Sequence, residues 1–230
     1  MTGEGRARFE RIYALLRSRI CLLDYPPGMR LREEDLAEEF ETSRTPIRRV
    51  LARLEDEGYV RSVHGVGTMV TDIDSASLEQ VYRLRVELSE LIGRLSPIVP
   101  DAETIEAFDV MRRRCEALAK APDQRTFAQL NMDFLDLLMT LTENEPLREF
   151  SERLYYQTTR FWLKTVAGLE RHEEALASET DYFLREISDI ATAVSCGALE
   201  TVGQVRRAHV AMSYARLKAR ARGDVLPDEV

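Results

Sequence analysis

The chain concentrates arginine side chains in one short segment that also shows helical periodicity. This segment carries four arginines and no acidic residue before Glu55, and the arginines are Arg44, Arg48, Arg49 and Arg53. A guanidinium group keeps its positive charge and can donate two parallel hydrogen bonds to the O6 and N7 atoms of guanine. Arg44 and Arg48 stand near the start of the predicted helix, where side chains can reach base edges in a major groove. The segment therefore predicts a helix whose arginines contact DNA bases.

The sequence around these arginines predicts how they are held. An apolar face recurs at helical spacing, and it consists of Ile47, Val50, Leu51 and Leu54. Thr45 followed by Pro46 is typical of a helix start, because a hydroxyl can cap the helix and proline is tolerated at its first position. A shorter helix is expected at 32–40, and only the turn 41–43 separates the two. Two short helices joined by so tight a turn predict a helix-turn-helix with the second as recognition helix.

A β-hairpin is expected directly after the recognition helix. Gly58 is a typical helix end, and residues 59–63 and 68–71 read as two strands around the turn at 64–67. With a supporting helix at 9–23, residues 1–72 are predicted to form a winged helix-turn-helix of three helices and a hairpin wing. The alternative is an ordinary helical pair whose arginines form a solvated face.

The chain contains the run Ser43-Arg44-Thr45-Pro46-Ile47-Arg48, followed by Leu51, Leu54, Gly58 and His64-Gly65-Val66-Gly67. This pattern resembles the DNA-binding domain of GntR-family transcriptional regulators. The resemblance implies that operator DNA is touched by Arg44, Thr45, Arg48, His64 and Gly65. Arg49 lies on the same basic helix and joins the predicted set. Glu34 stands where relatives often carry a DNA-contacting arginine, and Val66 replaces an arginine in the turn. Each departure removes a positive group, so we expect a lower affinity or an unusual operator.

Length and composition narrow the class of protein. A chain of 230 residues can form two domains with cores, and 44% hydrophobic with 31% charged residues is ordinary for a globular protein. The net charge of −8 argues against a general nucleic-acid binder and favours a sequence-specific reader. Cys21, Cys115 and Cys196 are isolated, which fits a reducing cytoplasm. The sequence shows neither a signal peptide nor an apolar run of the roughly 18 residues that a membrane span needs, so we expect a cytoplasmic protein without a membrane partner.

The remainder of the chain reads as helical. After a polar linker at 73–77, helices are predicted at 77–95, 101–120, 123–142, 146–167, 172–195 and 199–222. Residues 78–222 are therefore expected to form an all-α bundle of six or seven helices that binds an effector and dimerises. Residues 223–230 are expected to be a disordered tail. The predicted fold class is mainly α.

Three parts of the predicted bundle carry a further resemblance: residues 82–88, residues 130–135 with Asn144, and the stretch from Ile190 through Gly197 to His209. These parts resemble the FCD effector domain of the same regulators. That domain commonly holds a divalent metal with one aspartate and three histidines. The resemblance places these ligands at Asn131, Leu135, Ile187 and His209. One imidazole and a neutral amide cannot supply the three or four donors that such a metal needs, so no metal or other cofactor is expected. No phosphate loop, nucleophile elbow or paired metal-spaced histidines are present either, which argues against catalytic residues and an enzyme.

Three polar side chains lie on otherwise apolar stripes of the predicted helices: Arg85, Asn131 and His209. A buried guanidinium needs an anion, which is either a neighbouring carboxylate of the protein or the carboxylate of a small acid. The Asn131 amide needs a partner, which could be His209, a water molecule or an effector. His209 is either a hydrogen-bonded core residue or a ligand contact. Because many FCD regulators respond to organic acids, the resemblance favours an effector site made by these three residues.

Together these patterns predict a homodimeric, sequence-specific regulator that binds double-stranded operator DNA and acts as a repressor. They also predict a small carboxylate effector that is sensed without a metal. The alternative is a helical sensor or scaffold that has lost DNA binding, which Glu34, Val66 and the net charge of −8 favour.

Overall fold

The computed structural model describes residues 3–72 and 75–222. The chain divides into two compact units, Met1–Asp74 and Ser75–Val230. The predicted tail at 223–230 and residues 73–74 of the predicted linker lie outside the described residues. The predicted fold class, a winged helix-turn-helix followed by an all-α domain, is confirmed. Within the described residues, no helix is long and apolar enough to cross a membrane.

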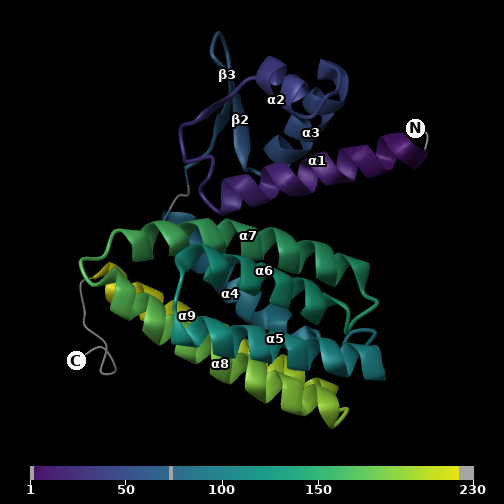
Figure 1. Ribbon diagram of the computed structural model, residues 1–230, viewed down its shortest axis with the longest axis vertical. Helices are drawn as coiled ribbons and strands as arrows, with labels where there is room; N and C mark the ends of the chain where they lie inside the picture. Colours follow the sequence, from purple (N-terminus) through teal and green to yellow (C-terminus); the bar gives the residue numbers. More distant parts are fainter. Residues whose placement is uncertain (1–2, 73–74, 223–230) are drawn as a thin grey trace. The chain divides into compact units, whose positions relative to one another are not determined.

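The first unit is a three-helix domain with a small antiparallel sheet (Figure 1). Its elements are α1 (Gly3–Cys21), β1 (Arg30–Leu31), α2 (Glu33–Glu39), α3 (Arg44–Asp56), β2 (Val60–Val63) and β3 (Gly67–Val70). The strand order is β1-β3-β2. The short strand β1 was not predicted, because two residues show no alternation in sequence. It exists because Arg30 and Leu31 pair with Met69 and Thr68 of β3.

The apolar face of α3 packs against α1, as its periodicity predicts. Ile47, Val50 and Leu54 have no exposed surface, and the same holds for Ile12, Leu16 and Ile20 of α1. Burying an aliphatic side chain of this size contributes about 1.5–3 kcal/mol. The orientation of α3 is thus fixed by its buried face, and its opposite face has to lie in solvent.

The start of α3 differs from the prediction. Ser43 occupies the N-cap position and Arg44 is the first helical residue, so Thr45 does not cap the helix. The Ser43 side chain forms no capping hydrogen bond. Pro46 is the third helical residue, where its missing N–H is still one of the four that lack a partner within a helix. The proline therefore marks the helix start correctly, although the helix begins two residues earlier than predicted.

The second unit is an all-α bundle. Its helices are α4 (Ser75–Leu91), α5 (Ala102–Lys120), α6 (Gln124–Met139), α7 (Glu145–Ala167), α8 (His172–Ser195) and α9 (Leu199–Ala221). Three of them begin with a side-chain cap, in which Asp101 accepts from the Thr104 N–H (2.8 Å), Asp123 from the Thr126 N–H (2.7 Å) and Asn144 from the Leu147 N–H (2.9 Å). Such caps satisfy backbone donors that a helix leaves open, which explains why these helices begin close to the predicted positions.

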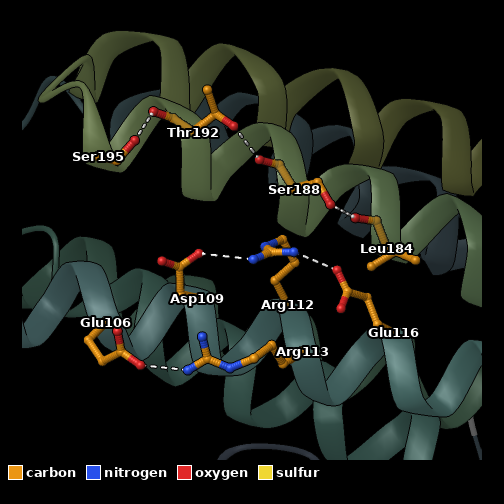
Figure 2. Close-up of polar contacts among 9 residues, drawn as sticks. All are labelled: Glu106, Asp109, Arg112, Arg113, Glu116, Leu184, Ser188, Thr192 and Ser195. Carbon is orange, nitrogen blue, oxygen red and sulfur yellow. Dashed lines mark hydrogen bonds and ion pairs between the residues drawn. The ribbon is translucent and has the colours of Figure 1, made fainter.

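The polar side chains drawn on α5 and α8 contact neighbours on their own helix (Figure 2). On α5, Arg112 lies between Asp109 and Glu116, with contacts of 3.5 and 2.5 Å, and Arg113 contacts Glu106 at 2.5 Å. On α8, the hydroxyls of Ser188, Thr192 and Ser195 donate to backbone carbonyls of their own helix. These carboxylates and hydroxyls are therefore engaged by neighbours on the same helix.

Two glycines allow α4 and α9 to approach each other closely. A Cβ atom on Gly203 of α9 would lie 2.4 Å from the carbonyl oxygen of Glu90 in α4. A Cβ atom on Gly93, just after α4, would lie 1.8 Å from the carbonyl oxygen of Leu199 at the start of α9. Both distances are shorter than van der Waals contact and involve backbone atoms. Only glycine fits at these two positions without moving the helices apart.

We expect Gly203→Ala to lower the free energy of unfolding by about 1–3 kcal/mol, because the added methyl group overpacks a backbone contact. Helix propensity alone would give the opposite sign, a gain of about 1 kcal/mol. Urea unfolding followed by circular dichroism measures the change. Gly168→Ala is the matched control, since a Cβ there first meets an atom at 3.5 Å. A Gly203→Ala protein at least as stable as the wild type would contradict the close crossing.

Candidate functional site

The N-terminal half of α3 presents its polar side chains to solvent. Arg44, Thr45, Arg48 and Arg49 are all exposed. They lie outside the buried stripe of the helix, and Arg49 also reaches α1, with its guanidinium carbon 5.8 Å from the centroid of the Phe9 ring. The four predicted α3 residues therefore form one accessible surface, which is a requirement for entering a DNA groove.

Two arginines of this surface are paired with acids from the first turn of α2. Arg44 Nη1 lies 3.0 Å from Glu34 Oε1, and Arg48 Nε donates to Glu33 Oε2 at 2.6 Å. The sequence patterns did not predict these contacts, since they identified Glu34 only as a missing positive charge. Each acid is ten or more residues away from its arginine along the chain, so no helical spacing relates them. The tight turn between the two helices brings them together.

Arg53 is part of the support of α3 rather than of its basic surface. Its guanidinium contacts Glu10 at 3.1 Å and Glu57 at 3.2 Å, and its central carbon lies 3.8 Å from the centroid of the Tyr13 ring. The Tyr13 hydroxyl donates to Glu57 Oε2 at 2.5 Å. Burial raises the pKa of Tyr13 above its ordinary value, so the phenol keeps its proton and the hydrogen bond. This cluster joins α1 to α3.

The wing carries His64 and Gly65 at its tip, and both are exposed. The turn is closed by a hydrogen bond from the Val66 N–H to the Val63 carbonyl at 3.0 Å. Gly65 has a φ of +75° and Gly67 a φ of +115°, which other residues rarely adopt. The two glycines therefore determine the shape of the turn that presents His64.

The second unit contains a cavity of about 80 Å³ that is lined by five of its helices, α4 and α6 to α9. Six aromatic rings form much of its wall, and they belong to Tyr82, Phe127, Tyr155, Trp162, Tyr182 and Phe183. Arg85 from α4, Asn131 from α6 and His209 from α9 all line the same cavity. The structure thus brings together the three residues that the sequence singled out. The cavity has room for several water molecules or a small polar ligand.

Arg85 reaches the cavity without an acidic partner. Its Nη1 atom donates to the Thr158 hydroxyl at 2.5 Å, and its guanidinium carbon lies 5.2 Å from the ring centroids of both Tyr82 and Tyr155. Among the described residues, no carboxylate lies within 4.0 Å of this guanidinium. Burial lowers the pKa of Arg85, although an arginine side chain remains charged in proteins. Of the two alternatives for Arg85, an ion pair with a neighbouring acid is therefore not what the structure shows, and its guanidinium lines the cavity.

The acids that do line the cavity are occupied by other arginines. Glu186 forms a buried ion pair with Arg206. Glu179 accepts from Arg216 at 2.6 and 3.1 Å and from Arg220 at 2.5 Å. The sequence reasoning missed this set. Its signal was the placement of Glu179 and Glu186 two helical turns apart on the buried side of α8.

Asn131 and His209 are half-buried polar residues that line the cavity. The Asn131 amide donates to the Phe127 carbonyl of its own helix at 3.0 Å, so His209 is not its partner. His209 Nε2 lies 3.8 Å from Asp189 Oδ2, which is longer than a hydrogen bond. Both side chains keep hydrogen-bonding capacity on the cavity side.

The positions that the FCD resemblance gives to metal ligands do not fit a metal. Leu135 and Ile187 are buried hydrocarbon side chains and have no lone pair to offer. Of the neighbouring acids, Asp133 contacts Arg114 at 2.6 Å and Glu186 is paired with Arg206. Within the described residues, no group of three or more histidines, cysteines or acids converges on one point.

Comparison with known proteins matches both units. The family model described as bacterial regulatory proteins, gntR family, covers residues 8–70, and the FCD domain model covers residues 80–212. The chain is 26% identical over 148 residues to an uncharacterized HTH-type transcriptional regulator, YdhC, of Bacillus subtilis. That alignment spans 63% of this chain and 65% of the relative, so the match extends over somewhat less than two thirds of the relative's length.

Two further comparisons agree. A probable D-xylose utilization operon transcriptional repressor of Paenarthrobacter nicotinovorans is 29% identical over 125 residues, which cover 53% of this chain and 54% of that protein. The solved structure of Escherichia coli McbR/YncC superposes with a TM-score of 0.78 at 16% identity and covers 93% of this chain and 98% of that one. At this identity the structural similarity concerns the fold alone.

We expect Arg206→Met to destabilise the second unit by about 3–5 kcal/mol, because it leaves the buried Glu186 carboxylate without its partner. The double variant Arg206→Met/Glu186→Leu should recover most of that loss, since no charge is then left unpaired. Urea unfolding monitors both. Arg207→Met is the matched control: Arg207 is exposed and forms surface pairs with Glu87 and Glu90 at 3.1 and 3.2 Å. A loss for Arg206→Met no larger than for Arg207→Met would disprove the importance of this ion pair.

Proposed function

The chain belongs to the GntR family of bacterial regulatory proteins and carries an FCD domain, and on this premise we propose that it represses transcription by binding a specific operator. Family membership makes it a transcriptional regulator rather than an enzyme. The repressor named among its relatives supports the proposed sign of regulation. The observation that carries the proposal is the exposed basic end of α3 within a winged helix-turn-helix.

In the proposed complex, α3 enters the major groove with its N-terminal end. Arg44 and Arg48 donate to guanine O6 and N7, each contributing about 1–3 kcal/mol of discrimination between bases. Thr45, Arg49 and the exposed His64-Gly65 turn contact phosphates or the edge of the minor groove, which fixes the register of the protein on the duplex. A homodimer would place two such helices in successive major grooves, so the operator is expected to be near-palindromic.

A small carboxylate is the proposed effector, and the cavity of the second unit is its proposed site. The guanidinium of Arg85, which has no acidic partner among the described residues, supplies the attraction for an anion. Asn131 and His209 supply further hydrogen-bonding groups on the same wall. Such a ligand changes operator binding only as far as it prefers one packing of the helical bundle over another. No metal takes part in this proposal.

The second candidate function is a helical sensor or scaffold that no longer binds DNA. The pairing of Arg44 and Arg48 with acids favours it, because these pairs offset the charge that attracts phosphate. A DNA-binding assay separates the two candidates, because only the regulator prefers particular duplexes.

We expect the wild-type protein to select a near-palindromic sequence from a random duplex library and to bind it far more tightly than a scrambled duplex. Arg48→Ala should weaken binding to the selected duplex by about 1–3 kcal/mol and relax the preference at one base pair per half-site. Arg61→Ala, at an exposed position of β2, should leave the base preference unchanged. Fluorescence anisotropy at fixed salt measures both. Equal and uniform losses from the two variants would reject the assignment, and a wild type without preference would favour the scaffold.

We expect one or more small mono- or dicarboxylic acids to raise the melting temperature of the wild-type protein by several degrees at saturating concentration, since a ligand at about 100 times its Kd stabilises by about 2.7 kcal/mol. Arg85→Gln should abolish that shift. Arg83→Gln is the matched control, because Arg83 lies on the same helix, is exposed and contacts Glu79 at 2.8 Å on the surface.

Metal analysis of protein purified without chelator should find no stoichiometric metal. Adding Zn²⁺, Ni²⁺ or Mn²⁺ should not raise the melting temperature in the same thermal assay. A bound metal that is lost in His209→Ala would show that the ligands were assigned wrongly. Failure of every acid in the panel would indicate constitutive operator binding.

A further inference from the structure

The first turn of α2 places two consecutive carboxylates beside the exposed arginines of α3. Glu33 and Glu34 follow the N-cap residue Arg32, and acids are favoured at this end of a helix by the helix dipole. Their partners Arg48 and Arg44 are the two arginines proposed to read bases. Among the described residues, the other acids of α2 form no ion pair with α3. One of them, Glu39, pairs with Arg19 of α1.

The two contacts differ in kind. The contact between Arg48 Nε and Glu33 Oε2 is a directed hydrogen bond of 2.6 Å, and the Glu33 side chain is only 31% exposed. It uses the Nε side of the guanidinium, so the two terminal nitrogens stay available for a bidentate contact with guanine. The Arg44–Glu34 pair is a 3.0 Å charge contact between side chains that are 55% and 59% exposed. Glu33 therefore orients Arg48, whereas Glu34 mainly offsets the charge of Arg44.

We propose that Glu33 and Glu34 are specificity-determining residues that suppress binding to arbitrary DNA. A carboxylate beside α3 repels phosphate, so it penalises every complex in which the arginines rest on the DNA backbone. In the operator complex Arg48 donates to a base through its terminal nitrogens and keeps Glu33 on Nε. The penalty then falls more heavily on non-specific complexes, and the ratio of specific to non-specific affinity increases. This inference rests on the proposed binding of DNA by α3.

The test compares single variants of the full chain on two duplexes, the sequence selected by the wild type and a scrambled duplex of equal composition. Glu33→Gln and Glu34→Gln should each raise affinity for the scrambled duplex. The ratio of the two affinities should fall about fivefold or more for Glu33→Gln, because the charged hydrogen bond that orients Arg48 is replaced by a weaker neutral one, and less for Glu34→Gln. For the scrambled duplex, the slope of log affinity against log salt should steepen by about 0.9 for each additional phosphate that the variant neutralises.

Glu38→Gln is the matched control, because Glu38 is exposed on the same helix and its removal changes the net charge by the same amount. It should change both affinities equally and leave their ratio unchanged. In an Arg48→Ala background, Glu33→Gln should have no further effect on the ratio, which a merely structural role of Glu33 would not predict.

The outcomes are distinguishable. An unchanged ratio in Glu33→Gln and Glu34→Gln, or a change equal to that of Glu38→Gln, overturns the inference while operator binding by the wild type still stands. A wild type that selects no sequence overturns the proposed function and, with it, the discrimination assigned to the two acids.

Discussion

Charge that is buried among hydrocarbon side chains has to be matched, and this requirement organises the second unit. Glu179 binds two arginines of α9 and Glu186 binds a third, so the long helices α8 and α9 are held in one register. The same requirement is left open at Arg85, whose neighbours are a hydroxyl and two rings. Arg206 and Arg220 are buried and paired with carboxylates, whereas no carboxylate of the described residues lies within 4.0 Å of the Arg85 guanidinium. This contrast is what supports the proposed anion site.

The first unit was largely predictable because its signals are local. The spacing of Ile47, Val50 and Leu54 defines both the buried and the exposed face of α3, and the burial pattern agrees. What the sequence could not show depends on residues that are distant along the chain. Strand β1 is created by its pairing with β3, and Arg53 is drawn from the basic surface by Tyr13 and Glu10, about forty residues away. The cap at Ser43 rather than Thr45 is a difference of local geometry that propensity does not resolve.

The cavity was predictable only in part. Arg85, Asn131 and His209 stood out because each places a polar group on an apolar stripe, and all three line the cavity. Glu179, Glu186 and Arg206 did not stand out, because acids and arginines abound on the exposed faces of these helices, as on α5. Only the three-dimensional packing separates the buried charges from the solvated ones. That no acid among the described residues pairs with Arg85 is likewise a property of the folded bundle, since the sequence offers several acids at suitable distances along the chain.

The close crossing at Gly93 and Gly203 has a mechanical consequence. At these two glycines the backbones touch, so no side chain lies between them there that could change rotamer and absorb a displacement. We therefore expect helices α4 and α9 to move together as a rigid pair. Arg85 and His209 belong to this helix pair, and α4 is also the first helix of the second unit. We therefore expect a displacement of the cavity wall at Arg85 or His209 to move both helices together.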